Sequence, residues 1–376
     1  MAALSVRYCE LTSLPASISH HTKLTLLDVT GNQLTSLPKS FGNLLHLKKL
    51  YLDDNQLTAF PAVLENLLQL EEIHIDRNQL ISLPESIQRF TKLKILNVYN
   101  NQLTSVPENL GRLTQLIEAS LGKNQLTSLP EAFWQLTNLR VLNIAENRLS
   151  AISEHIGNLT HLVTLDLAHN ELATLPTSLG NLTNLTYFLY LSNNHLTSLP
   201  DSLGNLSKLM YLNATDNHLT SLPDTIGDLA SLKELRLYNN ELTTLPESLG
   251  NLGNLKELHL MNNQLTSLPT SLGNLTNLKE LYLMNNQLAS LPDSIGDLRK
   301  LTRLDLRNNK LTSLPVSLGN LESLTHLDLR GNRLVALPAS LGNLEKLEKL
   351  DLRWNKLAAT PGWLHKLEKR GCIVFT

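Results

Sequence analysis

The sequence predicts an α/β solenoid, a fold in which one short unit is repeated and stacked along the chain. Asparagine recurs every 23 residues from Asn32 to Asn170, and again from Asn194 to Asn355. All fifteen prolines occupy a second position of the same unit, where only Ser153 replaces them. Leucine fills most of the other fixed positions, so the unit reads LxxLxLxxNxLxxLPxxLGNLxx and occurs about sixteen times.

Each unit opens with LxxLxL, in which leucines alternate with variable residues. This alternation predicts a short strand whose leucines point into the interior. Strands of successive units then lie side by side, about 4.8 Å apart, and form a parallel sheet with one strand per repeat. We expect this sheet on the concave side of the array.

The asparagine that follows each strand is predicted to be structural. Its amide can donate and accept hydrogen bonds for backbone groups that turn away from water. The proline farther along fixes φ and has no N–H to donate. It therefore suits a convex side built of extended and 3-10 segments.

The C-terminal residues 361–376 depart from the unit and predict a cap. The stretch PGWLHKLEKR reads as a short amphipathic helix with Trp363, Leu364 and Leu367 inward. Gly371 ends this helix, and CIVF forms a last strand that covers the edge of the sheet. Because no linker or shift in composition interrupts the repeats, we expect one domain spanning residues 1–376.

The repeated unit resembles the leucine-rich repeat, in its short 23-residue form with LP in the second half. The resemblance covers essentially the whole chain. It is similar to the repeats of intracellular bacterial proteins and of plant Ras-group-related proteins. The resemblance implies a horseshoe-shaped solenoid that binds a protein partner.

Composition narrows the classes of function. The formal net charge is −2, which gives no reason to expect bulk attraction to nucleic acid or to an anionic membrane. Only two cysteines occur, Cys9 and Cys372, so we expect a reducing, cytoplasmic location. We expect no cofactor or metal, because no phosphate-binding loop, kinase motif, nucleophile elbow or Cys/His cluster is present. A monomer is favoured over an obligate oligomer.

Function is expected at the variable positions of the strands, because the fixed positions build the scaffold. Tyrosine gathers there, and it is enriched in binding hot spots. Neighbouring repeats should stack the side chains into one candidate surface, whose residues are Tyr187, Tyr190, Tyr211, Tyr238, His259, Met261, Tyr282 and Met284. The alternative is that tyrosine is simply favoured in strands.

The repeat at residues 185–200, LTYFLYLSNNHLTSLP, is one residue longer than its neighbours. The extra residue lies between Leu185 and Leu189. We expect a bulge near Tyr187 and Phe188, which would bend the array and turn an aromatic ring outward. A neutral insertion between duplicated units is the alternative.

A second feature lies near the C-terminus, where three repeats read RLDLR, HLDLR and KLDLR. One interpretation is a ladder of Asp305, Asp328 and Asp351 whose charges the flanking basic residues neutralise. The other is a basic strip that receives carboxylates or phosphates. The strip would consist of Arg307, Arg330 and Arg353 and end at Trp354.

The sequence therefore favours a non-catalytic module or scaffold that binds a protein on its concave face. The alternative is the recognition arm of a larger enzyme, such as a kinase, GTPase or ubiquitin ligase, whose catalytic domain lies outside this chain.

Overall fold

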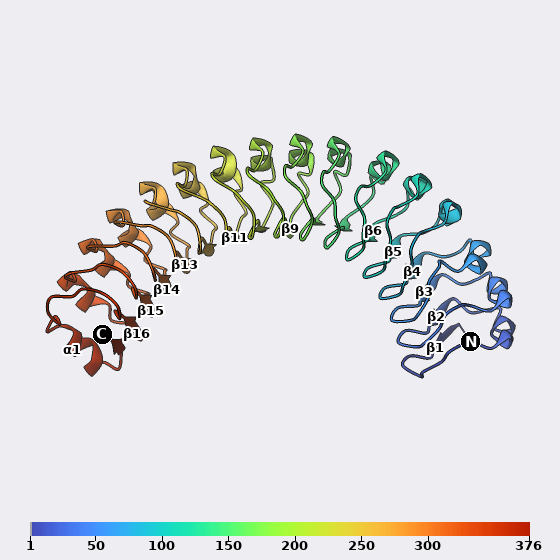
Figure 1. The fold of residues 1–376 in the computed structure, drawn as a ribbon, viewed down its shortest axis with the longest axis horizontal. Coiled ribbons are helices and arrows are strands. Elements are labelled where there is room, and N and C mark those ends of the chain that lie inside the picture. The colour runs from blue at the N-terminus through green and yellow to red at the C-terminus, as the bar shows by residue number, and fades with distance from the viewer. Residues whose placement is uncertain (1) are drawn as a thin grey trace. The chain divides into compact units, whose positions relative to one another are not determined.

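The computed structural model describes residues 2–376, which divide into two compact units, one ending at Leu185 and one beginning at Thr186. Within each unit, strands follow one another along one side and 3-10 helices along the other (Figure 1). The α/β solenoid that the sequence predicts is confirmed, with one strand per repeat and 3-10 turns on the outer side. The expectation of one domain over residues 1–376 stays a prediction.

The first unit holds eight strands between residues 2 and 185, each paired in parallel with the next. They are β1 (Ala3–Ser5), β2 (Leu26–Asp28), β3 (Lys49–Tyr51), β4 (Glu72–His74), β5 (Ile95–Asn97), β6 (Glu118–Ser120), β7 (Val141–Asn143) and β8 (Thr164–Asp166). Its 3-10 helices are η1 (Ala16–His20), η2 (Lys39–Asn43), η3 (Ala62–Asn66), η4 (Glu85–Arg89), η5 (Glu108–Arg112), η6 (Glu131–Gln135), η7 (Glu154–Asn158) and η8 (Thr177–Asn181).

The second unit holds nine parallel strands from residue 186 onward, again paired in chain order. They are β9 (Phe188–Tyr190), β10 (Tyr211–Asn213), β11 (Glu234–Arg236), β12 (Glu257–His259), β13 (Glu280–Tyr282), β14 (Arg303–Asp305), β15 (His326–Asp328), β16 (Lys349–Asp351) and β17 (Ile373–Phe375). Its helices are η9 (Asp201–Asn205), η10 (Asp224–Asp228), η11 (Glu247–Asn251), η12 (Thr270–Asn274), η13 (Asp293–Asp297), η14 (Val316–Asn320), η15 (Ala339–Asn343) and α1 (Leu364–Lys369).

The core of each unit is a stack of leucines. In the second unit, Leu235, Leu258 and Leu281 lie directly opposite one another in neighbouring strands and are fully buried. Side chains alternate along a strand, so the residues on either side of each central leucine project from the other side of the sheet. We call that side the open face, and it carries the variable residues.

Within each unit, the asparagine column joins a repeat to the one before it. Asn263 donates through Nδ2 to the carbonyls of Leu237 and Leu260 at 3.0 and 3.1 Å, and its Oδ1 accepts from the Leu242 N–H at 3.0 Å. These are backbone groups that the buried turn hides from water. The structural role expected for the asparagines is confirmed.

The residue before each of these asparagines adopts the left-handed backbone conformation, as at Asn262 with φ of 53° and Trp354 with φ of 59°. Asparagine tolerates this conformation better than most residues. Four such side chains form an exposed amide chain in which Asn308 donates to Asn285, Asn285 to Asn262, and Asn262 to Asn239.

The proline column starts the outer turns. Pro246, with φ of −71° and ψ of 150°, directly precedes η11, and Pro269 and Pro292 precede η12 and η13 in the same extended conformation. At the one exception, Ser153 accepts a hydrogen bond from the His155 N–H through its side chain. A hydroxyl cap therefore replaces proline at the start of η7.

The C-terminal cap is confirmed as a helix followed by a strand. Leu364 and Leu367 of α1 are buried, and Trp363 is half-buried against Gly342. Gly371 takes a φ of 95°, which few other residues adopt, and β17 then pairs in parallel with β16. Cys372 is buried between these elements.

Candidate functional site

All twelve candidate residues lie in the second unit, on its open face or at the ends of its strands. Tyr190, Tyr211, His259 and Tyr282 belong to strands, and Tyr187 immediately precedes β9. The remaining seven follow their strands by two or three residues, namely Tyr238, Met261, Met284, Arg307, Arg330, Arg353 and Trp354.

Four aromatic rings gather where β9 meets β10. Phe188 stacks on Tyr190 with ring centroids 5.4 Å apart, and both contact Tyr211, at 5.5 and 5.4 Å. Tyr187 lies 6.4 Å from Phe188. We call Tyr187, Phe188, Tyr190 and Tyr211 the aromatic cluster. Tyr187 and Phe188 remain 50% and 39% exposed, so the cluster offers apolar surface to solvent.

The extra residue of this repeat supplies one of the two exposed rings of the cluster. The Thr186 carbonyl accepts from the Met210 N–H at 2.9 Å, just as the Met210 carbonyl accepts from Lys233 in the next repeat. Phe188 then pairs with Tyr211 in ordinary register. The surplus residue is therefore Tyr187, which forms a bend before β9. The expected outward aromatic ring is confirmed, and the expected effect on the course of the array stays a prediction.

Phe188 was absent from the candidate set, because the rule that selected tyrosines ignored phenylalanine. The extra residue before β9 is the sequence signal that points to Phe188, because this residue changes how the chain enters the strand. Burial raises the pKa of the Tyr211 phenol to about 12, so this hydroxyl stays neutral and can donate a hydrogen bond at physiological pH.

Next to the cluster, polar and charged side chains pair within β11 and within β12. The Arg236 guanidinium lies 5.4 Å above the Tyr211 ring, and its Nε donates to Glu234 at 2.5 Å. His259 stacks on Tyr282 at 4.8 Å, with its Nε2 lying 3.3 Å from Glu257. Burial, followed by the charge of Arg236, lowers the pKa of His259, so its imidazole is neutral at physiological pH.

Glu234, Glu257 and His259 are the one group of possible metal ligands found among residues 2–376, with ligand atoms within 4.8 Å of one another. Two carboxylates and a neutral imidazole are suitable donors for a transition metal. The guanidinium of Arg236, however, already binds Glu234 and places a positive charge beside the group. An incoming cation would have to displace or tolerate that charge.

A row of free backbone donors follows the strands of this region. After β14, β15 and β16, the N–H two residues past the strand end donates to an aspartate of that strand, as Arg307 does to Asp305 at 3.2 Å. Within the described chain, the equivalent N–H groups of Tyr238, Met261 and Met284 have no acceptor. Their strands end in arginine, histidine and tyrosine, which supply no carboxylate or amide oxygen. These three donors remain available to a ligand.

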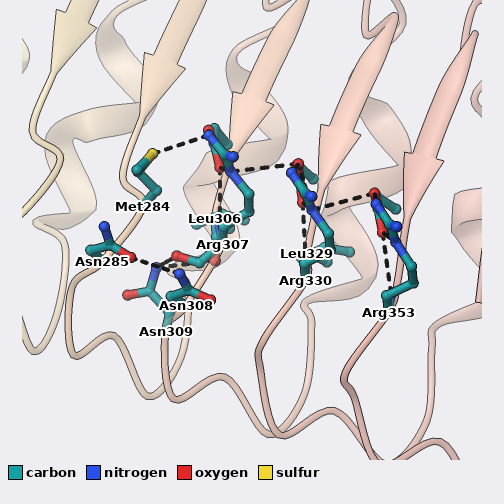
Figure 2. Close-up of polar contacts among 12 residues, drawn as sticks. Met284, Asn285, Leu306, Arg307, Asn308, Asn309, Leu329, Arg330 and Arg353 are labelled. Carbon is teal, nitrogen blue, oxygen red and sulfur yellow. Dashed lines mark hydrogen bonds and ion pairs between the residues drawn. The ribbon is translucent and has the colours of Figure 1, made fainter.

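Farther along, the arginines at the ends of β14–β16 are already paired (Figure 2). Arg307, Arg330 and Arg353 bind the aspartate two residues earlier through Nη2, at 2.5, 2.6 and 2.6 Å. Arg330 also reaches Asp351 of the next strand at 3.3 Å. The structure thus forms the neutralised ladder, one of the two arrangements that the sequence allows. Arg307 further contacts the Met284 sulfur at 3.0 Å, which links the ladder to the methionines.

Trp354 stands apart from the aromatic cluster at the C-terminal end of the face. It is 71% exposed and lies beside the Arg353 guanidinium at 5.7 Å. Tryptophan is enriched among the residues that anchor protein interfaces.

The first unit carries an acidic group on its open face. Asp53 accepts from the Asp76 N–H, and Asp76 accepts from the Tyr99 N–H, both at 2.8 Å. Burial and the neighbouring charge of Asp53 raise the pKa of Asp76 to about 7. The fold therefore favours the protonated carboxyl, and this disfavours the native state progressively as the pH rises from about 4 to about 7.

Replacing Asp76 with asparagine is expected to stabilise the protein by about 1–2 kcal/mol at pH 8 and to leave its stability unchanged near pH 4. Asparagine keeps the oxygen that accepts from Tyr99 and carries no charge. Urea unfolding at both pH values measures the effect, with exposed Glu108→Gln as control. Equal stabilisation at the two pH values would contradict the assignment.

Comparison with known proteins agrees with this architecture. Leucine-rich repeat models match the chain over residues 120–210 and 198–303, over 22–80, 276–334 and 299–357, and over 92–113. A solved leucine-rich repeat protein of Leptospira interrogans is 37% identical, with 99% of this chain and 95% of that chain aligned at a TM-score of 0.90. No similar sequence is found among curated proteins.

More distant structures share the fold. The Arabidopsis receptor kinase HAESA, solved with the peptide hormone IDA and the co-receptor SERK1, is 27% identical over 100% of this chain and 73% of that chain, at a TM-score of 0.72. An internalin of Listeria monocytogenes is 26% identical over 83% and 88%, at a TM-score of 0.69.

The chain belongs to the leucine-rich repeat family, in the form with a 23-residue repeat. Membership of this family supports a role as a protein-interaction module. Within residues 2–376, no helix combines the length and apolar character needed to cross a membrane.

Proposed function

We propose that the chain is a non-catalytic module that binds a protein partner on the concave, open face of its second unit. The observation that carries this proposal is the aromatic cluster. Two of its four rings, those of Tyr187 and Phe188, stay exposed to solvent although a buried leucine core lies next to them. Clustered aromatic side chains give large contact area at low entropic cost and act as anchors in protein interfaces.

Two further features support the same face. The free N–H groups of Tyr238, Met261 and Met284 would receive carbonyl or side-chain oxygens of a docked chain, and the two methionine side chains can adapt to its shape. HAESA, a structure similar to this one, was solved with a peptide hormone bound. These features favour a partner that presents an apolar anchor to the cluster and polar backbone to the donors.

The test is an affinity measurement with the partner recovered by cross-linking at Tyr211 and then purified. Replacing Tyr211 and Tyr238 with alanine is expected to weaken binding at least tenfold, because each truncation removes an anchor worth about 1–2 kcal/mol or more. Tyr99→Ala, which changes a tyrosine on the open face of the first unit, is the matched control. Unchanged affinity of a folded double variant would reject the site.

A second candidate is the recognition arm of a larger enzyme. The similarity to HAESA favours it, because that protein is a receptor kinase. Sequencing the gene on both sides of this chain tests it, and an open reading frame confined to these repeats would exclude it. In either case we expect a cytoplasmic monomer, consistent with two unpaired cysteines, and a fusion protein found outside the cytoplasm would contradict this location.

A further inference from the structure

We propose that the depression over β13–β16 is a subsite for carboxylate side chains of the partner, held by Arg303 and Lys349. The inference rests on the proposed function, because the depression lies on the same open face and the carboxylates belong to the docked protein. The proposed anion-binding residues differ from the strip of Arg307, Arg330 and Arg353 that the sequence suggested.

The depression has a volume of about 250 Å³ and is open to solvent. Tyr282 closes the end nearest the aromatic cluster, and Arg303, His326 and Lys349 follow from the first position of the next three strands. Asp305 and Asp328 lie beside them in the same lining. A volume of this size accommodates one or two carboxylate groups.

The cations that line the depression differ in how they are paired. Arg307 and Arg330 each bind an aspartate of their own strand, so their charge is neutralised in place. Among the described residues, Arg303 and Lys349 form no ion pair. Lys349 lies 5.6 Å above the Phe375 ring, a contact that positions its ammonium without neutralising it.

The lining therefore has an excess of positive charge. It includes Arg303, Arg307, Arg330 and Lys349 against two aspartates, in a chain whose net charge is −2. An incoming anion gains charge-assisted hydrogen bonds from the two unpaired cations. Glu348 is adjacent to Lys349 in sequence but is not part of the lining.

The spacing of these cations indicates how the ligand lies. Arg303 pairs in register with His326, and His326 with Lys349, so Arg303 and Lys349 are two strand steps apart, or about 10 Å. His326 lines the depression between the two cations, and its Nδ1 lies 2.9 Å from the Thr325 hydroxyl. Two carboxylates on one extended segment that crosses the strands would reach both cations.

Carboxylates suit this site better than phosphate. Asp305 and Asp328 keep two negative charges in the lining, and the repulsion they exert grows with the charge of the ligand. A phosphate carries close to two negative charges at neutral pH, whereas each carboxylate carries one. The guanidinium of Arg303 can bind a single carboxylate with two parallel hydrogen bonds.

The experiment is isothermal titration of the whole protein at low salt with hexaglutamate, and in parallel with hexalysine and with inorganic phosphate. The test variant is Arg303→Gln/Lys349→Gln. The matched control is Arg299→Gln/Lys300→Gln, which removes two exposed cations of the same region that lie on the outer turn, one of them paired with Glu322. Both variants change the net charge equally, and thermal unfolding confirms that they are folded.

We expect hexaglutamate to bind the native protein, the test variant to bind it at least tenfold more weakly, and the control to stay within about twofold. No binding of hexaglutamate, equal weakening in both variants, or binding of hexalysine or phosphate in its place would overturn the subsite. The proposed function is judged separately by Tyr211 and Tyr238, because hexaglutamate has no aromatic anchor and its binding does not depend on the aromatic cluster.

Discussion

Replacing Leu258 with alanine should lower the free energy of unfolding by about 2–5 kcal/mol. Leu258 is the central residue of β12, is fully buried, and lies between Leu235 and Leu281 of the neighbouring strands. The change removes three buried carbon atoms, and the repeats on either side hold the space open, so a cavity remains.

Denaturant unfolding measures this loss, with Lys256→Ala as control. Lys256 is exposed in the segment leading into the same strand, and its replacement should change stability by no more than about 0.5 kcal/mol. A loss below about 1 kcal/mol for Leu258→Ala would mean that the leucines do not form the core. The assignment of the variable residues to the open face would then be wrong.

Replacing Asp351 with alanine should cost about 2–3 kcal/mol at pH 7. Asp351 is fully buried, and it binds Arg353 Nη2 at 2.6 Å and Arg330 Nε at 3.3 Å. It also accepts from the Arg353 N–H. Removing it leaves the half-buried Arg353 guanidinium without its carboxylate acceptor and takes from Arg330 one of its two aspartates, although water reaches both guanidinium groups and lessens the penalty.

This loss should depend on pH. Burial raises the pKa of Asp351, but the hydrogen bonds from Arg353 and the charges of Arg330 and Arg353 together outweigh it, so the pKa lies below its usual range. A carboxyl with a lowered pKa stabilises the fold at pH values above about 4, and this contribution disappears as the pH falls through the folded-state value.

Urea unfolding of native protein and of Asp351→Ala at pH 7 and below pH 4 measures the difference. The two proteins should converge in stability at the lower pH. Asp297→Ala, at an exposed position of η13, is the control and should have little effect at either pH. A difference that persists unchanged into acid would show that packing, rather than the ion pairs, explains the loss.

The fold could be predicted from the sequence because residues at the same position of successive repeats make the same stabilising interactions. The Asn263 amide satisfies backbone groups of its own repeat and the one before it, and Asn78 and Asn309 do the same in their repeats. The same interactions return every 23 residues, so the period alone carries strands, turns and core. The C-terminal cap could also be predicted from the sequence, because an LxxL segment followed by Gly371 interrupts the 23-residue period.

The candidate site was predicted less completely, because it depends on which side chains fill the variable positions next to one another. The sequence placed Arg307 and Asp305 in adjacent columns, and only geometry shows that they bind each other and leave Arg303 unpaired. The sequence does contain a signal for the free N–H groups, namely the identity of the last residue of each strand. They occur after β11, β12 and β13, whose last residue is neither aspartate nor asparagine.

The central claim is that a partner covers the open face of the second unit, and amide hydrogen exchange of the purified complex tests it most directly. The N–H groups of Tyr238, Met261 and Met284 have no acceptor, so they should exchange rapidly in the free protein and slowly once the partner is bound. Slowing confined to the outer helices η9–η13, with these three amides exchanging as fast as before, would contradict the account.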